Sequence, residues 1–140
     1  MCKQIEYWSD CDFKDFLKGG YARMEKGCIF CQIVNGETAT EILYQNENVV
    51  VFEDIHPQAP VHLLIVPKTH IRSINDLTAA DSAIVSEMIL AAKQMAREHG
   101  VAKSGYKLFY NVERGGGQLI FHLHMHLIGG FHENLSQKRV

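Results

Sequence analysis

The sequence has little that is typical of a membrane protein or of a protein that binds long nucleic acids. It contains no run of 18 apolar residues, so we expect no membrane-spanning helix. Lys and Arg number 14 against 16 acidic residues, and the net charge of −2 provides no broad basic surface for a long nucleic acid. The first residues lack the apolar segment of a secretory signal, so we expect a cytoplasmic protein.

Proline and tryptophan are also scarce, with three and one residues, and no internal repeat occurs. What the chain does have is 46% hydrophobic residues in 140, which is enough for the core of one domain. Residues 1–26 mix aromatic and charged side chains without strand alternation, so we interpret them as an N-terminal extension with a short helix over residues 11–18. Residues 27–140 form the predicted domain.

Hydrophobic periodicity predicts one long helix among several short strands. Apolar residues recur at helical spacing over residues 78–99, where Thr78 and Asp81 resemble a capping box. The other predicted elements are a short helix over residues 28–34 and strands over residues 42–44, 49–52, 62–66, 106–111 and 119–128. The order of strands, helix and strands predicts an α+β domain with a mostly antiparallel sheet.

Three histidines alternate with apolar residues near the end of the chain. His122, His124 and His126 share one face if residues 119–128 form a strand, because side chains alternate with a period of two. Neutral imidazoles can act as nucleophile, proton carrier or metal ligand near pH 7. The preceding glycines at 115–117 allow backbone N–H groups to turn inward around an anion. A plain hairpin turn is the alternative for these glycines.

Cys28 and Cys31 form a Cys-x-x-Cys pair. In a reducing compartment this spacing indicates half of a metal site or a redox pair, and two buried free thiols are the alternative. Cys2 and Cys11 have no evident partners.

Residues 117–128 resemble the signature of the histidine triad (HIT) family, in which three histidines alternate with apolar residues. Residues 54–62, 66–70 and 105–111 resemble the Hint branch of that family in order and spacing, so the resemblance covers about residues 27–130. It implies the HIT fold, with a five-stranded, mostly antiparallel sheet, one long helix and a short helix. It also implies a homodimer.

For function, the resemblance implies hydrolysis of the bond to the α-phosphate of purine nucleoside 5′-phosphoramidates or related adenylates. His124 is the implied nucleophile, and it passes through a nucleotidyl-histidine intermediate. His126 is implied to contact the phosphate and the leaving group, and His62 to belong to a histidine relay. Hydrolysis of dinucleoside polyphosphates, or nucleotide binding with little turnover, are the alternatives.

The resemblance also implies binding sites for a purine mononucleotide and for zinc. The implied base pocket is Ile29, Phe30, Ile33, Phe52 and Ile55. Asp54 is implied to hold the ribose hydroxyls, and Asn111 with the backbone around Gly117, Gln118 and Leu119 to hold the phosphate. Cys28 and Cys31 with His70 and His122 form the implied Cys₂His₂ zinc site, which is structural, and catalysis needs no cofactor. Leu119 stands where many relatives have Ser or Thr, so a side-chain donor to the phosphate is missing.

A different class of enzyme remains an alternative from the residues alone. Three histidines can hold a catalytic metal, as in cupins, but a cupin needs a glutamate soon after its His-x-His. The nearest downstream glutamate is Glu133, which is too distant in sequence.

Overall fold

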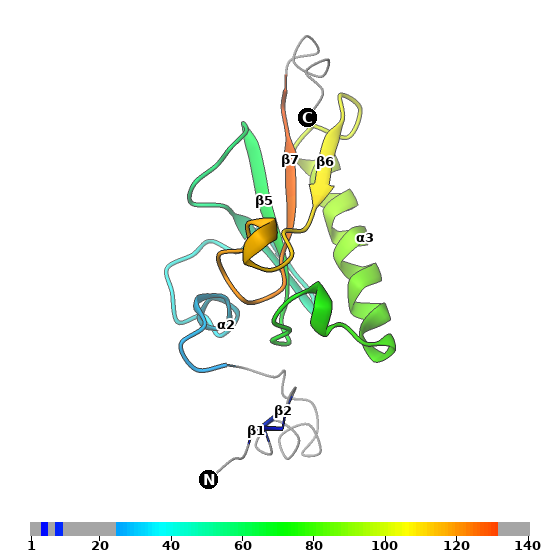
Figure 1. Cartoon of the computed structure of the whole chain (residues 1–140). Coiled ribbons are helices and arrows are strands. Elements are labelled where there is room, and N and C mark those ends of the chain that lie inside the picture. The colour runs from blue at the N-terminus through cyan, green and yellow to red at the C-terminus, as the bar shows by residue number, and fades with distance from the viewer. Residues whose placement is uncertain (1–3, 6–7, 10–24, 132–140) are drawn as a thin grey trace.

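The computed structural model describes residues 4–5, 8–9 and 25–131. Its centre is a five-stranded antiparallel sheet with the order β3-β4-β5-β7-β6 (Figure 1). The strands are β3 (Tyr44–Gln45), β4 (Val49–Glu53), β5 (Val61–Pro67), β6 (Tyr106–Phe109) and β7 (Met125–Gly129). The helices are α2 (Ile29–Val34) and α3 (Ser82–Glu98), with 3₁₀ turns η1 (Ile74–Asp76), η2 (Ala79–Asp81) and η3 (Arg114–Gly116). These elements confirm the predicted α+β class, antiparallel sheet, long helix and short helix.

A separate two-stranded pairing joins β1 (Gln4–Ile5) to β2 (Trp8–Ser9), which the sequence pattern did not predict. The helix predicted over residues 11–18 lies outside the described residues. Within the described ranges, none of the helices has the length and apolar character needed to cross a membrane.

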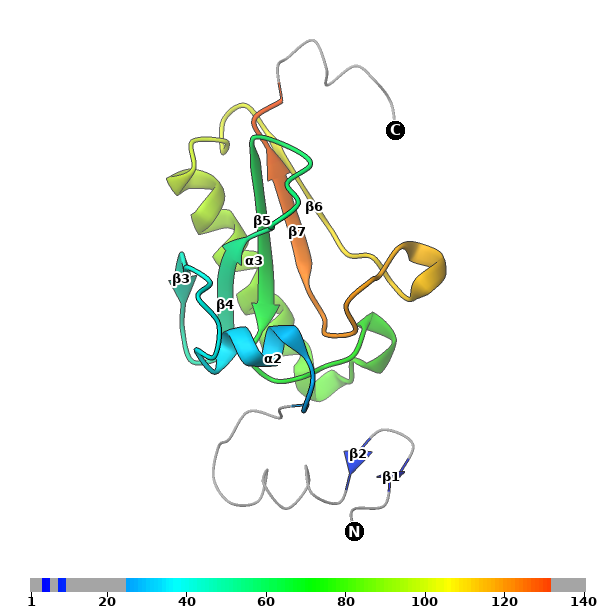
Figure 2. The same cartoon turned by 90° about the vertical axis from the view of Figure 1, so that its left-hand side faces the viewer.

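The two faces of the sheet have different coverings, because successive side chains of a strand point to opposite faces. Figure 2 shows α3 behind the sheet and α2 in front of it. Leu63 and Ile65 of β5 pack in the cluster that includes α3, whereas Leu64 and Val66 pack with Phe30 of α2. His62 therefore points to the α2 face, together with His126 of the neighbouring strand.

The long helix begins later than predicted. Residues 79–81 form η2, and α3 starts at Ser82. The predicted capping box is confirmed, since the backbone N–H of Thr78 donates to the carboxylate of Asp81 at 2.9 Å. The box therefore caps the 3₁₀ turn that leads into the helix.

The last strand is shorter than the predicted range of 119–128. β7 begins at Met125, so His126 lies in the strand whereas His122 and His124 precede it. The backbone N–H of Leu123 donates to the carbonyl of Ile71 at 2.6 Å instead of joining the ladder with β5. The backbone stays extended enough to alternate: Leu123 and Met125 enter the α3 core, while His124 packs against Phe30 on the α2 face.

Candidate active site and metal centre

The three buried histidines His62, His124 and His126 meet on the α2 face of the sheet. Nε2 of His62 lies 2.9 Å from Nδ1 of His126, and the ring centroids of His124 and His126 are 5.1 Å apart. Each of the three residues is at most 8% exposed. The structure thus brings together the residues predicted to carry the chemistry.

Their hydrogen bonds determine which ring nitrogen carries the proton. The backbone N–H of Gln58 donates to Nδ1 of His62 at 3.0 Å, so the neutral His62 ring carries its proton on Nε2 and donates to His126. His126 accepts at Nδ1 and therefore carries its own proton on Nε2. That Nε2 is buried without a partner among the described residues, so it can donate to a bound group.

His124 has the opposite tautomer. Its Nδ1 donates to the backbone carbonyl of His122 at 2.7 Å, which leaves a lone pair on Nε2. This Nε2 makes no hydrogen bond within the described part of the chain. A neutral imidazole with a free lone pair is a nucleophile that needs no additional base.

Burial keeps both rings neutral. Desolvation lowers the pKa of His124, and it lowers the pKa of His126 to about 4 with the help of the neighbouring His124 and His62. Both imidazoles are therefore uncharged near pH 7.

Two aromatic residues enclose these rings. Phe109 of β6 is the register partner of His126, and its ring stacks on the imidazole with centroids 4.7 Å apart and planes 6° apart. Phe30 of α2 meets His124 edge-on at 5.1 Å. Phe109 was not predicted as a site residue, because its position depends on strand register.

Asp54 follows β4 and lies beside the relay. One carboxylate oxygen accepts the backbone N–H of His56 at 2.8 Å, and the other lies 3.3 Å from Nε2 of His62. These contacts hold the carboxylate at the edge of the histidine cluster. Asp54, His62 and His126 could together hold a metal by proximity. The protonated Nε2 of His62 makes them a poor fit, because a metal needs that lone pair.

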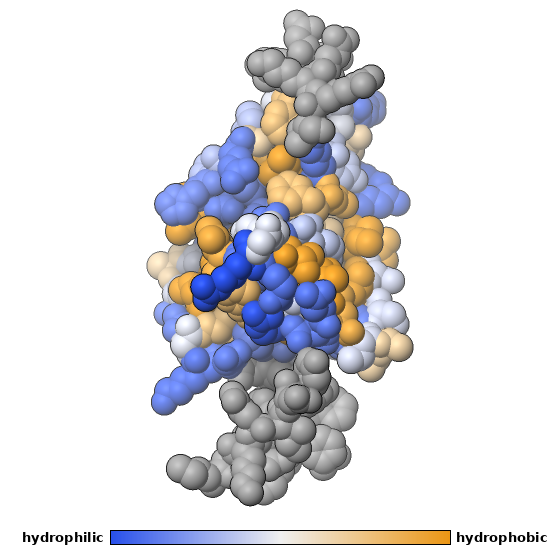
Figure 3. Space-filling view, viewed as in Figure 1, coloured by the Kyte–Doolittle hydropathy of each residue, from blue (hydrophilic) through white to orange (hydrophobic). Residues whose placement is uncertain are grey.

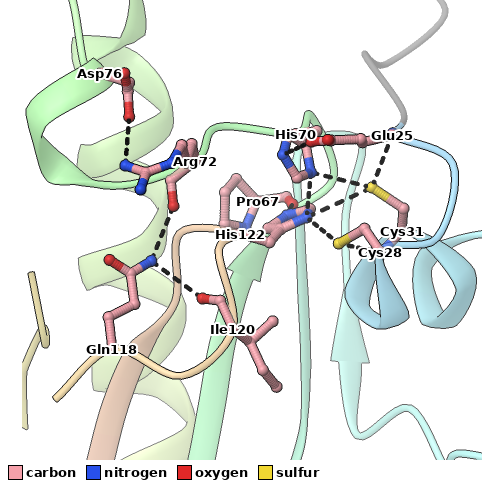
Figure 4. A network of polar contacts seen from close by, with 10 residues as sticks. All are labelled: Glu25, Cys28, Cys31, Pro67, His70, Arg72, Asp76, Gln118, Ile120 and His122. Carbon is pink, nitrogen blue, oxygen red and sulfur yellow. Dashed lines mark hydrogen bonds and ion pairs between the residues drawn. The ribbon is translucent and has the colours of Figure 1, made fainter. Parts of the chain in front are cut away.

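The glycine-rich segment forms η3 between β6 and β7. Gly117 has a φ of 86°, in the left-handed region that glycine tolerates, and a Cβ at this position would lie 3.9 Å from the Asn111 side chain. Glu113 also has a positive φ, 59°, and its carboxylate accepts two bonds of 2.6 Å from Arg72. The Gln118 side chain is 2% exposed and accepts the backbone N–H of Glu113. It also donates to the carbonyls of Arg72 and Ile120 (Figure 4). It braces the loop, and the backbone N–H of Gln118 also donates within the loop, to the Glu113 carbonyl at 3.0 Å.

The predicted base-pocket residues divide into two groups. Phe30, Ile33 and Phe52 are at most 8% exposed and belong to the core under α2. Ile29 and Ile55 are 42% and 84% exposed and can touch a ligand directly. Leu119, which is 88% exposed, is another apolar side chain at the surface. Figure 3 shows hydrophobic residues reaching the surface across the middle of one face, among hydrophilic ones.

The four predicted metal ligands converge beside α2. Sγ of Cys28 and Cys31 and Nδ1 of His70 and His122 lie within 4.8 Å of one another (Figure 4). Four of the six separations run from 3.1 Å between the two Nδ1 atoms to 3.5 Å between Cys31 and His122. A tetrahedral zinc site has ligand atoms roughly 3.3–3.8 Å apart, by its usual bond lengths.

The chemistry of these atoms also fits a cation. Nε2 of His122 donates to the Pro67 carbonyl at 2.8 Å, and Nε2 of His70 lies 2.5 Å from a carboxylate oxygen of Glu25, which favours a proton on that nitrogen. Both Nδ1 atoms therefore present lone pairs to each other, which a metal between them would satisfy. Contact between the thiols lowers the pKa of the Cys28 thiol and raises that of Cys31, so one sulfur is readily ionised.

Comparisons with known proteins agree with this geometry. Residues 27–140 match the family described as "Scavenger mRNA decapping enzyme C-term binding". The chain is 42% identical over 107 residues to the purine nucleoside phosphoramidase of Escherichia coli (strain K12), covering 76% of this chain and 90% of the relative.

Solved structures show the same fold. The crystal structure of a HIT family hydrolase from Legionella pneumophila Philadelphia 1 is 43% identical and superposes with a TM-score of 0.74, covering 76% of this chain and 95% of that one. A Zn-bound histidine triad family protein from Mycobacterium smegmatis is 27% identical with a TM-score of 0.68, and the match covers 81% of each chain. The chain therefore belongs to the histidine triad family of hydrolases.

Proposed function

We propose that this protein hydrolyses purine nucleoside 5′-phosphoramidates and related adenylates at the bond to the α-phosphate. The observation that carries the proposal is the free lone pair on Nε2 of the buried, neutral His124. The similarity to a purine nucleoside phosphoramidase supports the choice of substrate.

The reaction has two displacements at phosphorus. In the first, Nε2 of His124 bonds to phosphorus, the bond to the amine nitrogen breaks, and the amine leaves with the electron pair and takes up one proton. In the second, water attacks, the bond to Nε2 breaks, and the proton that water loses balances the one that the amine took. The His124 ring is positively charged in between, and its Nδ1–H bond to the His122 carbonyl stabilises that charge.

His126 and His62 support this reaction without changing charge. We assign the unpartnered Nε2–H of His126 to a hydrogen bond with the phosphate or the leaving atom, where charge develops. His62 fixes the orientation of His126 through the 2.9 Å bond. Both are already in the required tautomer before substrate binds.

The nucleotide has a place beside these groups. The backbone of residues 117–119 and the Asn111 side chain are proposed to hold the phosphate, with the N–H of Leu119 as the backbone donor, because those of Gly117 and Gln118 donate to loop carbonyls. Asp54 is proposed to hold the ribose hydroxyls. The base lies against Ile29 and Ile55, with Phe30, Ile33 and Phe52 supporting them from the core. Leu119 contributes only its backbone.

We further propose that Cys28, Cys31, His70 and His122 hold zinc in a structural role. When bound, zinc cross-links α2 to the segments that carry His70 and His122, and it takes no part in the displacements.

Ile89 and Leu90, which are 47% and 62% exposed on α3, offer an apolar face for the proposed homodimer.

The test is release of AMP from adenosine 5′-phosphoramidate. Wild type should release AMP, and His124→Ala should lose at least about 10³-fold in kcat, as expected for removal of a nucleophile. His99→Ala, a histidine at the end of α3, is the matched control and should retain activity. Equal release by wild type and His124→Ala, or none by wild type, would refute the proposal.

A further inference from the structure

Glu25 contacts two of the four candidate metal ligands at once. Its carboxylate lies 2.5 Å from Nε2 of His70, and its backbone N–H donates to Sγ of Cys31 at 3.3 Å (Figure 4). Glu25 lies two residues before the segment that matches the family, which begins at residue 27. These contacts therefore belong to this chain's own N-terminal extension.

Each of the two contacts prepares an atom for a metal. The carboxylate beside Nε2 of His70 favours a proton on that nitrogen, which leaves the Nδ1 lone pair facing Cys31, 3.3 Å away. The backbone N–H stabilises negative charge on the sulfur of Cys31. Without these contacts, His70 could reverse its tautomer and Cys31 would lack its donor.

The two candidate histidine ligands differ in the partner of their Nε2 atom. His122 is 0% exposed, and a neutral backbone carbonyl of Pro67 holds its Nε2. The His70 side chain is 11% exposed, and its partner is a carboxylate that is itself 64% exposed. The His70 side of the site therefore depends on a single surface side chain.

We propose that Glu25 is a positioning residue of the metal centre, and that metal binding in turn fixes the chain at residues 25–26. This inference rests on the proposed zinc site and is independent of the proposed phosphoramidase activity. Outer carboxylates of this kind usually contribute about 10- to 100-fold in metal affinity.

The first experiment measures Zn²⁺ affinity by competition with a chromophoric chelator, with no substrate present. Glu25→Ala should bind Zn²⁺ at least about 10-fold more weakly than wild type, and Glu25→Gln, which keeps an acceptor oxygen without the charge, should lie between them. Glu37→Ala removes another exposed carboxylate near α2 and should bind like wild type. Affinity of Glu25→Ala within about twofold of wild type would overturn the role of Glu25.

The second experiment measures trypsin cleavage after the exposed Lys26, identified by fragment mass. Zn²⁺ should slow this cleavage several-fold in wild type and leave it unchanged in Glu25→Ala. Equal protection in both proteins would overturn the coupling. A wild type that does not bind Zn²⁺ would overturn the metal site as well, whatever the outcome of the AMP assay.

Discussion

The backbone carbonyl of His122 accepts the Nδ1 proton of His124 at 2.7 Å, while the ring of His122 faces Cys28, Cys31 and His70. One residue thus belongs to the candidate metal centre through its side chain and orients the candidate nucleophile through its backbone. The two sites are adjacent along the chain and share a structural element.

Metal removal should therefore weaken the fold more than it changes the chemistry. We expect a chelator to lower the Tm by more than about 5 °C, because a structural metal contributes folding free energy. Turnover should fall but persist, since no step in the displacements uses the metal. The measurements are thermal unfolding and AMP release with and without the chelator.

The double variant Cys28→Ser with Cys31→Ser is the control, and a chelator should not change its Tm. Complete loss of turnover with an unchanged Tm would show instead that the metal is catalytic.

Acid should destabilise the protein through His126. Its pKa is about 4 when folded, below the ordinary value of 6.5, so the unfolded chain binds the proton more readily between these values. The contribution of the neutral His126 to the free energy of unfolding is therefore present above pH 6.5 and is lost as the pH falls toward 4. By linkage, His126 lowers the free energy of unfolding by up to about 2 kcal/mol when the pH falls from 7.5 to 5.

The measurement is urea unfolding at both pH values for wild type and His126→Gln. The variant should lose less stability on acidification than wild type does. An identical pH dependence of the two proteins would contradict the neutral, buried state of His126.

Phe109 should keep His126 neutral by excluding water from its ring. Phe109→Ala opens the stacked face, so the pKa of His126 should rise from about 4 toward its ordinary value, as seen by NMR titration of the imidazole. The control is Leu108→Ala, on the opposite face of β6, which should reduce stability and leave that pKa unchanged. An unchanged pKa of His126 in Phe109→Ala would show that its other neighbours are enough to keep the ring neutral.

Leu119→Ser should raise activity. Leu119 is 88% exposed, so the change costs little packing, and the hydroxyl adds a donor beside the proposed phosphate position. One such hydrogen bond is worth about 1 kcal/mol, or roughly fivefold in kcat/KM. Leu119→Ala separates this gain from loss of the apolar side chain, and equal kcat/KM for the two variants would place the phosphate elsewhere.

The sequence pattern predicted the parts of the site that depend on local periodicity and on motif spacing. The alternation of His124 and His126 is an example. The convergence of Cys28 with His70 followed instead from the family resemblance. The pattern could not predict where β7 begins, because the Leu123 N–H finds a partner outside the sheet. The stacking of Phe109 on His126 could not be predicted either, because it depends on the register between β6 and β7.

Contacts from outside the motifs were equally inaccessible to the sequence. Glu25 lies in a segment without clear periodicity, and its role depends on how the chain enters α2. Gln118 was predicted to act through its backbone, and nothing in the sequence indicated that its side chain holds the loop. Both are decided by long-range packing.

The two faces of the sheet separate the packing of α3 from the histidine cluster. Met88 and Met95 of α3 pack behind the strands, whereas His124 and His126 lie on the side toward α2. Substitutions in the α3 layer can therefore change the thermal stability while His124 and His126 stay in place. The α2 layer allows fewer such changes, because its apolar residue Phe30 contacts His124 directly.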